Sequence, residues 1–292
     1  MKLVELIGNT PLIKIEKLNP FNNVEIYAKL EGQNPGGSVK DRAAYFMIKA
    51  ALESGQINRD STLIEATSGN TGIALAMIAA QYGIAIKLVM PENATPERIQ
   101  TMKAYGADVI LTPSEKTIEY SRQYAQEEAD KNGWVILDQF NNPNNKNAHE
   151  KTTGPEIWRD TNKKLTHFVS SMGTTGTITG TSTFLKSQNP DIQIVGAQPT
   201  EGSRIPGIRK WSPALVPSIY EPNRVDEIIY VNTAQATKAA RDLSSTEGIF
   251  AGMSSGGAFH IALEVASKLD HGLIVFIACD RGDRYLTSEL YS

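Results

Sequence analysis

One lysine in the sequence stands where an amine could act as a nucleophile. Lys40 lies in the run NPGGSVKDR (residues 34–42), which opens a predicted helix. The field at a helix N-terminus disfavours a cation, so the pKa of an amine there tends to fall. A partly desolvated lysine of lowered pKa is what Schiff-base chemistry needs. A solvated lysine paired with an acid is the ordinary alternative, and Lys40 alone leaves it open.

Three loops of small residues could each bind an anion. They cover residues 67–72, 173–177 and 252–257, and each precedes a predicted helix. Unpaired N–H groups and a partial positive charge at a helix N-terminus suit a phosphate or a carboxylate. One such loop is weak support, because glycines before helices also make plain turns. Two of them beside Lys40 indicate a ligand with two anionic ends, as pyridoxal phosphate carrying an amino acid has.

A different class of chemistry stays open at the third loop. The run GMSSG (residues 252–256) matches G-x-S-x-G, the pattern of a serine hydrolase, whose nucleophile would be Ser254. Asp270 and His271 follow, but two adjacent residues make an awkward relay for orienting a histidine. The sequence has no G-x-G-x-x-G after a strand, no P-loop and no H-E-x-x-H pair, so neither a nucleotide site nor a metal site is predicted.

Composition excludes several kinds of partner. The chain has 292 residues and one cysteine, Cys279, which rules out an internal disulfide and a multi-cysteine metal site. The net charge of −3 gives no basic excess for nucleic acid or an anionic membrane. The longest apolar run, residues 73–80, is too short to span a bilayer, and Glu5 interrupts any signal-peptide core. We therefore expect a cytoplasmic protein with neither a nucleic-acid nor a membrane partner.

Alternating strand and helix patterns must position the loops. Strand-like apolar runs cover residues 62–65, 84–90, 108–111, 134–137, 167–171, 193–197, 226–231 and 273–278. Helical patterns cover residues 38–54, 70–82, 96–105, 114–131, 176–186, 234–245 and 256–269. The alternation predicts an α/β fold of mostly parallel sheets flanked by helices. Residues 138–155 are rich in Asn and Pro and predict a loop, while Ser38 with Asp41 predicts a capping box.

Four runs, in order along the chain, resemble the cysteine synthase family. They are IGNTPL (7–12), NPGGSVKDR (34–42), EATSGNTG (65–72) and GTTGT (173–177). The resemblance implies a fold type II pyridoxal-phosphate enzyme, similar to the tryptophan synthase β chain, that acts as a homodimer. It also implies two domains. Residues 35–145 would form a smaller, mobile domain that closes on substrate, and residues 1–34 plus 146–292 a larger one that binds the cofactor phosphate.

The resemblance also implies roles for individual residues. Lys40 would bind the cofactor covalently and then remove the substrate's α-proton. The cofactor would be contacted by Asn70 at a ring oxygen, by Ser255 at the ring nitrogen, and by a phosphate loop of Gly173, Thr174, Thr175, Gly176 and Thr177. The substrate carboxylate would be bound by Thr67, Ser68, Gly69, Thr71 and Gln139. Because the phosphate loop contains no Lys or Arg, the partial positive charge at the helix N-terminus would attract the phosphate.

The implied reaction is a β-replacement in which O-acetylserine loses acetate and accepts sulfide, giving L-cysteine. Residues 173–177, 205–209 and 279–285 are similar to the B-type branch of the family, which is also linked to thiosulfate and S-sulfocysteine. A cystathionine β-synthase-like enzyme or a serine/threonine dehydratase stays open, because either would share Lys40 and the phosphate loop.

Four cations could help to bind thiosulfate in that reading. Arg209 is the candidate substrate contact, and Lys210, Arg281 and Arg284 are further cations suited to a polyoxyanion. An ordinary surface ion pair is the alternative for each of them. Arg204 and Lys210 depart from the pattern of the B-type branch. Cys279 is expected to line the same pocket.

Overall fold

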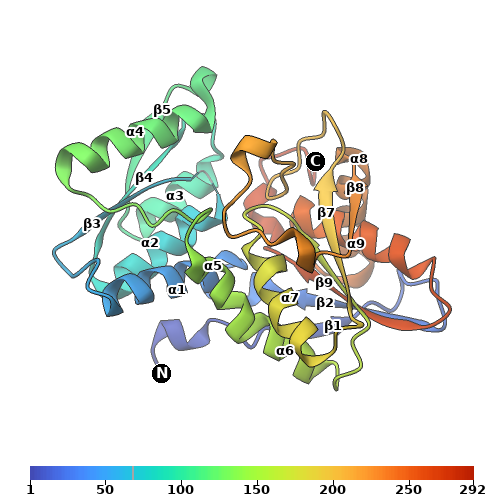
Figure 1. Ribbon diagram of the computed structural model, residues 1–292. Helices are drawn as coiled ribbons and strands as arrows, with labels where there is room; N and C mark the ends of the chain where they lie inside the picture. The colour runs from blue at the N-terminus through green and yellow to red at the C-terminus, as the bar shows by residue number, and fades with distance from the viewer. Residues whose placement is uncertain (68) are drawn as a thin grey trace.

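The computed structural model describes residues 1–67 and 69–292, and it confirms the predicted α/β fold. Two separate sheets lie on the left and right of Figure 1. The larger has the order β1-β2-β9-β6-β7-β8 and the smaller β3-β4-β5. Among the strand pairs of the described residues, only β1 and β2 are antiparallel. The strands are β1 (Leu12–Lys14), β2 (Val24–Leu30), β3 (Thr62–Ala66), β4 (Ala85–Pro91), β5 (Asp108–Thr112), β6 (His167–Ser171), β7 (Gln193–Pro199), β8 (Glu227–Val231) and β9 (Gly272–Ala278).

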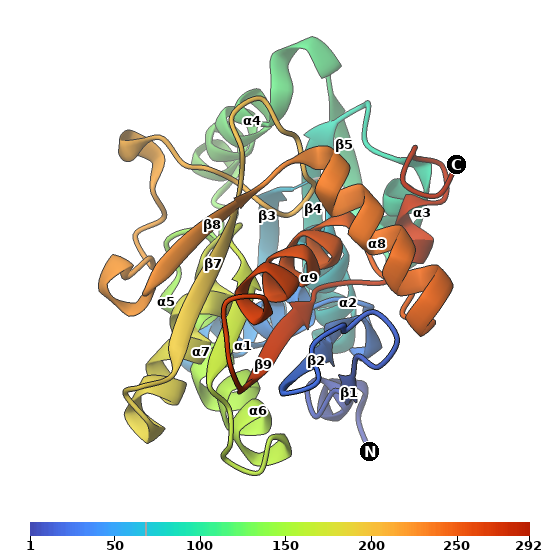
Figure 2. The ribbon, with the colours of Figure 1, turned by 90° about the vertical axis from the view of Figure 1, so that its right-hand side faces the viewer.

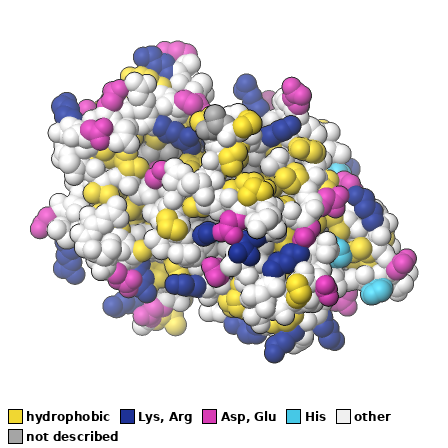
Figure 3. Space-filling view, viewed as in Figure 1, with side chains coloured by type: hydrophobic (Ala, Val, Ile, Leu, Met, Phe, Trp, Pro, Cys, Tyr) yellow, Lys and Arg dark blue, Asp and Glu magenta, His cyan; other side chains and the backbone are white. Residues whose placement is uncertain are grey.

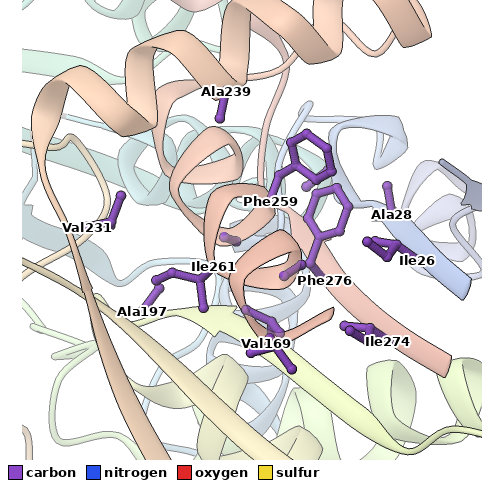
Figure 4. Packing of buried hydrophobic residues seen from close by; sticks show 14 of the residues in the cluster. Ile26, Ala28, Val169, Ala197, Val231, Ala239, Phe259, Ile261, Ile274 and Phe276 are labelled. Atoms are coloured by element: carbon purple, nitrogen blue, oxygen red, sulfur yellow. The ribbon is translucent and has the colours of Figure 1, made fainter. Parts of the chain in front are cut away.

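Helices cover both faces of the larger sheet. On one face α8 and α9 pack side by side (Figure 2), and the rings of Phe259 and Phe276 lie 5.3 Å apart in that layer (Figure 4). On the other face α6 and α7 pack through Ile157, Ile178 and Leu185. The helices are α1 (Lys40–Glu53), α2 (Asn70–Tyr82), α3 (Pro96–Ala104), α4 (Thr117–Asn132), α5 (Pro143–Ala148), α6 (Gly154–Asp160), α7 (Gly176–Gln188), α8 (Thr233–Glu247) and α9 (Met253–Ala266).

The smaller sheet is also buried on both faces. Leu63 and Leu88 join the core that α1 and α2 build on one side, and Ile64 and Val89 pack against α4 on the other. α2 lies inside this unit, so its side chains from Thr71 through Ala79 are all buried. The longest apolar run of the chain, residues 73–80, therefore belongs to a helix whose apolar side chains are buried inside the protein.

A predicted strand and a predicted capping box are wrong. Residues 134–137 form no strand; only Val135 bridges to Leu63, because the chain then turns at Asp138, whose φ is 52°. Ser38 and Asp41 form no capping box, since the N-cap of α1 is Val39. The Asp41 carboxylate instead accepts from the backbone N–H of Gly36 at 2.5 Å.

The predicted loop at residues 138–155 is largely helical, which corrects the sequence-based expectation. Asn142 caps α5 by accepting from the N–H of Asn144, and Pro143 fills the first helical position. A π-helical turn, His149–Thr153, then leads directly into α6. Low apolar content hid these helices, because they are stabilised by polar groups buried beside the site rather than by an apolar stripe.

Basic and acidic side chains are interspersed over the face seen in Figure 3. None of the helices within residues 1–67 and 69–292 is long and apolar enough to cross a membrane. In the same part of the chain, no three His, Cys, Asp or Glu side chains come together as metal ligands.

Candidate active site

A cavity of about 1140 Å³ lies where loops from both sheets converge. It is at the carboxyl ends of parallel strands, where open α/β sheets bind ligands. The cavity lining includes these residues singled out by the sequence: Lys40, Thr67, Gly69, Asn70, Thr71, Gln139, Gly173, Thr174, Arg204, Arg209, Lys210 and Ser254. Ser68 falls outside the described residues. The lysine and the first two small-residue loops therefore share one space.

Lys40 is the first residue of α1 and is partly buried at the cavity wall. Its position is fixed by main-chain contacts, because Val39 N–H donates to Cys279 O at 2.8 Å and Ser38 bridges to Asp280. Burial lowers the pKa of the Lys40 amine, against the opposing charges of Cys279 and Asp280. The Lys40 amine therefore loses its proton more readily than the amine of a surface lysine. The neutral amine is the form that acts as a nucleophile.

Asn70 begins α2 and is held at both ends of its amide. Its Nδ2 donates to Asp280 Oδ2 at 2.6 Å, and the Arg284 guanidinium donates to its Oδ1. Tyr285 Oη donates to the same Asp280 oxygen at 2.6 Å, and Arg284 also donates to Gly36 O. Sequence reasoning missed Asp280 as a cavity residue, although its run CDRGDRY was the visible signal. Cys279, expected in the pocket, is not among the lining residues.

Gln139 joins two of the small-residue loops. Its Oε1 accepts from Thr71 Oγ1 at 2.7 Å, and its main-chain carbonyl accepts from Asn145 Nδ2 at 2.7 Å. The same Asn145 nitrogen donates to Thr174 Oγ1 at 3.1 Å. Asn145, on α5, was not singled out by the sequence analysis, because it lies in the run mistaken for a loop. Both it and Gln139 are buried.

The loop of residues 173–177 has the features of an anion cradle at the N-terminus of α7. Thr175 has a φ of 69°, and its buried Oγ1 finds no hydrogen-bond partner among the described residues. A Cβ on Gly173 would lie 2.6 Å from Gly207 O, and one on Gly176 would lie 2.2 Å from Asn145 Oδ1. Positions 173 and 176 therefore have no room for a side chain. The unpaired Thr175 hydroxyl lies at the N-terminus of α7, where the helix favours an anion. These features fit a phosphate group.

Thr175, Gly176, Thr177 and Ser255 do not line the cavity, although all four are buried. Thr177 Oγ1 lies 3.3 Å from His149 Nε2, and His149 Nδ1 lies 2.9 Å from Thr153 Oγ1. Burial, with a contribution from Arg42, lowers the pKa of His149 to about 3. His149 is thus neutral at physiological pH and fixes the Thr177 hydroxyl from behind the loop, a contact that the sequence pattern did not reveal.

Two neighbouring serines at the start of α9 lie in different surroundings. Ser255 Oγ accepts from the N–H of Cys279 at 2.8 Å, whereas Ser254 lines the cavity. The serine-hydrolase alternative fails here. Asp270 and His271 follow the far end of α9, and fourteen helical residues span roughly 20 Å, so they lie too far from Ser254 to form a relay.

The cations expected to serve a second substrate separate into two groups. Arg209 and Lys210 line the cavity, and the Arg209 guanidinium lies 5.4 Å from the Trp211 ring centre. Burial and the nearby charge of Arg122 lower the pKa of Arg209. Arg281 instead pairs with Asp283 at 2.7 Å on the surface, and Arg284 turns inward to Asn70. Of these four cations, only Arg209 and Lys210 line the space that a ligand would enter.

A buried ion network explains the IGNTPL run at residues 7–12. Arg42 on α1 pairs with Glu31 and with Glu156, each at 2.7 Å, and Thr10 Oγ1 donates to Glu31 at 2.7 Å. Lys29, fully buried on β2, pairs with Glu156 at 2.8 Å. The network thereby ties the helix that carries Lys40 to the larger sheet. The network also explains why β2 was not predicted. Lys29 lies inside this strand, and a charged residue in a sequence normally indicates an exposed position.

Comparisons with known proteins give the family. The family described as pyridoxal-phosphate dependent enzyme matches residues 3–280. Cysteine synthase B of Salmonella typhimurium is 53% identical over 289 residues, which are 99% of this chain and 95% of that protein. An O-ureido-L-serine synthase structure has a TM-score of 0.94 at 34% identity, covering 99% of this chain and 94% of that one. The cysteine synthase structure of Entamoeba histolytica has a TM-score of 0.94 at 35% identity, covering 99% and 90%. The chain therefore belongs to the family of pyridoxal-phosphate dependent enzymes.

Proposed function

We propose that the protein is a cysteine synthase that converts O-acetyl-L-serine and sulfide into L-cysteine and acetate. The Cβ–O bond breaks with its electron pair leaving on acetate, and the sulfide sulfur forms the new Cβ–S bond. The observation that carries the proposal is Lys40, a half-buried amine of lowered pKa in a cavity it shares with two small-residue loops. The full-length identity to a cysteine synthase B adds the substrate class.

When bound, pyridoxal phosphate supplies an electron sink for negative charge at the substrate α-carbon. Lys40 would anchor it covalently, and its Nζ would take up the α-proton. Asn70 would contact the ring oxygen, and Ser255 or its neighbour Ser254 the ring nitrogen. The phosphate would be bound by the loop of Gly173, Thr174, Thr175, Gly176 and Thr177. Support comes from the unpartnered Thr175 Oγ1 and from the absence of room for larger side chains at two of these positions.

The substrate carboxylate would be bound by the loop at the start of α2. The proposed contacts are Thr67, Ser68, Gly69, Thr71 and Gln139. The hydrogen bond between Thr71 and Gln139 supports the grouping, because it brings a hydroxyl and an amide to one edge of the cavity. N–H groups at the first turn of α2 add to the attraction for a carboxylate.

We further propose that thiosulfate can replace sulfide, giving S-sulfocysteine. Arg209, with Lys210 beside it, would attract the dianion into the cavity. The B-type relative supports this branch of the family. The main rival is a related enzyme that joins the same amino-acid fragment to another nucleophile, or eliminates without replacement, as in cystathionine β-synthase or a serine/threonine dehydratase.

Residues 35–145 are proposed to move as the smaller domain. Strands β3–β5 and helices α1–α4 fall within that range, and the cavity takes its lining from both sides of the boundary. Closure would exclude water from the reacting groups. A homodimer in the cytoplasm is the expected form of the protein.

Product analysis tests the proposed function. Purified holoenzyme is supplied with O-acetylserine and, separately, with sulfide, thiosulfate, homocysteine or no nucleophile, and the amino-acid products are identified by mass spectrometry. We expect cysteine with sulfide and S-sulfocysteine with thiosulfate. Cystathionine as the main product, or pyruvate released equally in every arm, would establish one of the rivals instead.

A further inference from the structure

Glu65 is a buried carboxyl group to which the proposed chemistry gives no role. It lies near the end of β3 and is only 6% exposed. Its Oε2 accepts from the backbone N–H of Asp138 at 3.2 Å. A main-chain donor 73 residues away in the sequence is therefore bound by this one side chain.

The Glu65 carboxyl group extends the hydrogen bonding between β3 and the segment that contains Val135, which main-chain groups alone leave incomplete. Val135 N–H donates to Thr62 O at 3.0 Å, and Ile64 N–H donates to Val135 O at 3.0 Å. Beyond Val135 the chain turns at Asp138, which has a φ of 52°, and moves away from β3. Glu65 supplies from its side chain the acceptor that the turning segment would otherwise lack, because buried N–H groups must find partners.

The held segment leads directly to Gln139. The Gln139 side chain accepts from Thr71 Oγ1 at 2.7 Å, and its carbonyl accepts from Asn145 Nδ2 at 2.7 Å. Gln139 is thus one residue beyond the N–H group that Glu65 binds. Loss of that bond would free the backbone that aims the Gln139 amide.

We infer that Glu65 is a positioning residue whose carboxylate holds the main chain at Asp138 and thereby presents the Gln139 amide beside Thr71. Its importance for substrate rests on the proposed function, in which Gln139 and Thr71 bind the amino-acid carboxylate. The contacts of Glu65 themselves do not depend on that function.

The charged groups around Glu65 make the contact sensitive to pH. Burial raises the pKa of Glu65 to about 7, and the neighbouring Asp138 charge also raises it, while hydrogen bonding to the backbone and Arg122 on α4 oppose the rise. Strand β4 places the apolar Leu88 opposite Glu65. As pH falls through about 7 the carboxylate gains a proton and becomes a weaker acceptor, so the hold on the segment is lost on the acidic side.

The test uses the holoenzyme of Glu65→Gln beside Glu53→Gln, an exposed glutamate on α1, as control. Losing a bond to a charged acceptor raises the KM for O-acetylserine about tenfold, while the KM for sulfide stays unchanged. In a Gln139→Ala background the same substitution has no further effect. An unchanged KM, or effects of the two substitutions that simply add, would overturn the inference.

Hydrogen exchange read by mass spectrometry gives a readout that needs no activity. We expect the peptide containing Leu137 and Asp138 to exchange about tenfold faster in Glu65→Gln than in the parent above about pH 8. In the parent, protection corrected for intrinsic rates should fall as pH drops through 7, a measurement available even if the variant does not fold. Equal protection at all pH values would refute the role of Glu65. A protected, pH-sensitive segment in a protein without cysteine synthase activity would refute only the proposed function.

Discussion

The amide of Asn70 donates to the carboxylate of Asp280 across 2.6 Å, although 210 residues separate them in the sequence. Arg284 binds the other end of the same amide. The start of α2 and the run after β9 are therefore joined at the cavity. Asp280 also acts on Lys40, whose pKa its charge raises against the effect of burial.

Asp280→Asn should lower the pKa of Lys40 further, because it removes a negative charge that opposes the effect of burial. The measurement is the rate at which the apoenzyme's Lys40 reacts with acetic anhydride across a pH series, read by mass spectrometry. The midpoint should move to lower pH. Asp283→Asn, on the surface beside Arg281, is the control and should leave the midpoint in place.

Lys40→Ala should reduce turnover by about a thousandfold or more, because it removes both the covalent anchor and the group that moves the α-proton. The fold should persist, since Lys40 forms none of the ion pairs that tie α1 to the larger sheet. Circular dichroism and thermal unfolding check the fold, and cysteine formation checks the rate. Near-normal turnover in a folded variant would exclude Lys40 from the chemistry.

Arg42→Ala should destabilise the protein by about 3–5 kcal/mol, because it leaves the Glu31 and Glu156 carboxylates buried without their partner. Denaturant unfolding measures the loss. Arg159→Ala is the matched control, since its guanidinium pairs with Asp160 at the exposed surface. A comparable loss in both variants would contradict a special role for the buried network.

The same network predicts a loss of stability in acid. Burial alone would raise the pKa of Glu156, but Arg42 and Lys29 outweigh it and lower that pKa from 4.5 to about 2. A lowered folded-state pKa gives stability that is complete above the unfolded value and is lost as pH falls between these two values. Denaturant midpoints of the parent should drop in that range. Arg42→Ala should flatten this drop.

Ser255→Ala should lower stability by about 1–3 kcal/mol, because the partly buried N–H of Cys279 loses the oxygen that accepts from it. Ser254→Ala should cost less, since Ser254 lies at the cavity wall. Denaturant unfolding separates the two variants. The visible absorbance of each holoenzyme then tells which hydroxyl faces the cofactor ring, because only that variant should shift its maximum.

Arg209→Ala should raise the KM for thiosulfate about tenfold, as expected for the loss of one charge-assisted contact. The KM for sulfide should change little, because its single charge needs no guanidinium partner in the cavity. Initial rates with each donor make the comparison. Arg281→Ala removes a cation outside the cavity lining and serves as the control. Equal effects on both donors would argue for a general role in closure.

The sequence by itself determined the repeating α/β order and the local signals. Strand β6 and helix α2 have the bounds that their patterns predict, because burial on both faces or at every turn leaves an unambiguous apolar run. Lys40 and the loops at residues 67–72 and 173–177 were also visible, because glycines and hydroxyl residues before a helix carry a local physical meaning.

Only the tertiary structure decided which polar groups meet. Glu65 finds the N–H of Asp138, Asn70 finds Asp280, and Asn145 bridges Gln139 to Thr174. No periodicity records these contacts, because the pairs Glu65–Asp138, Asn70–Asp280 and Asn145–Thr174 are distant in sequence and meet only through the way the two sheets and their helices pack. Residues 143–148 were read as a loop for the same reason, since that short polar helix is stabilised by buried hydrogen bonds and not by an apolar stripe.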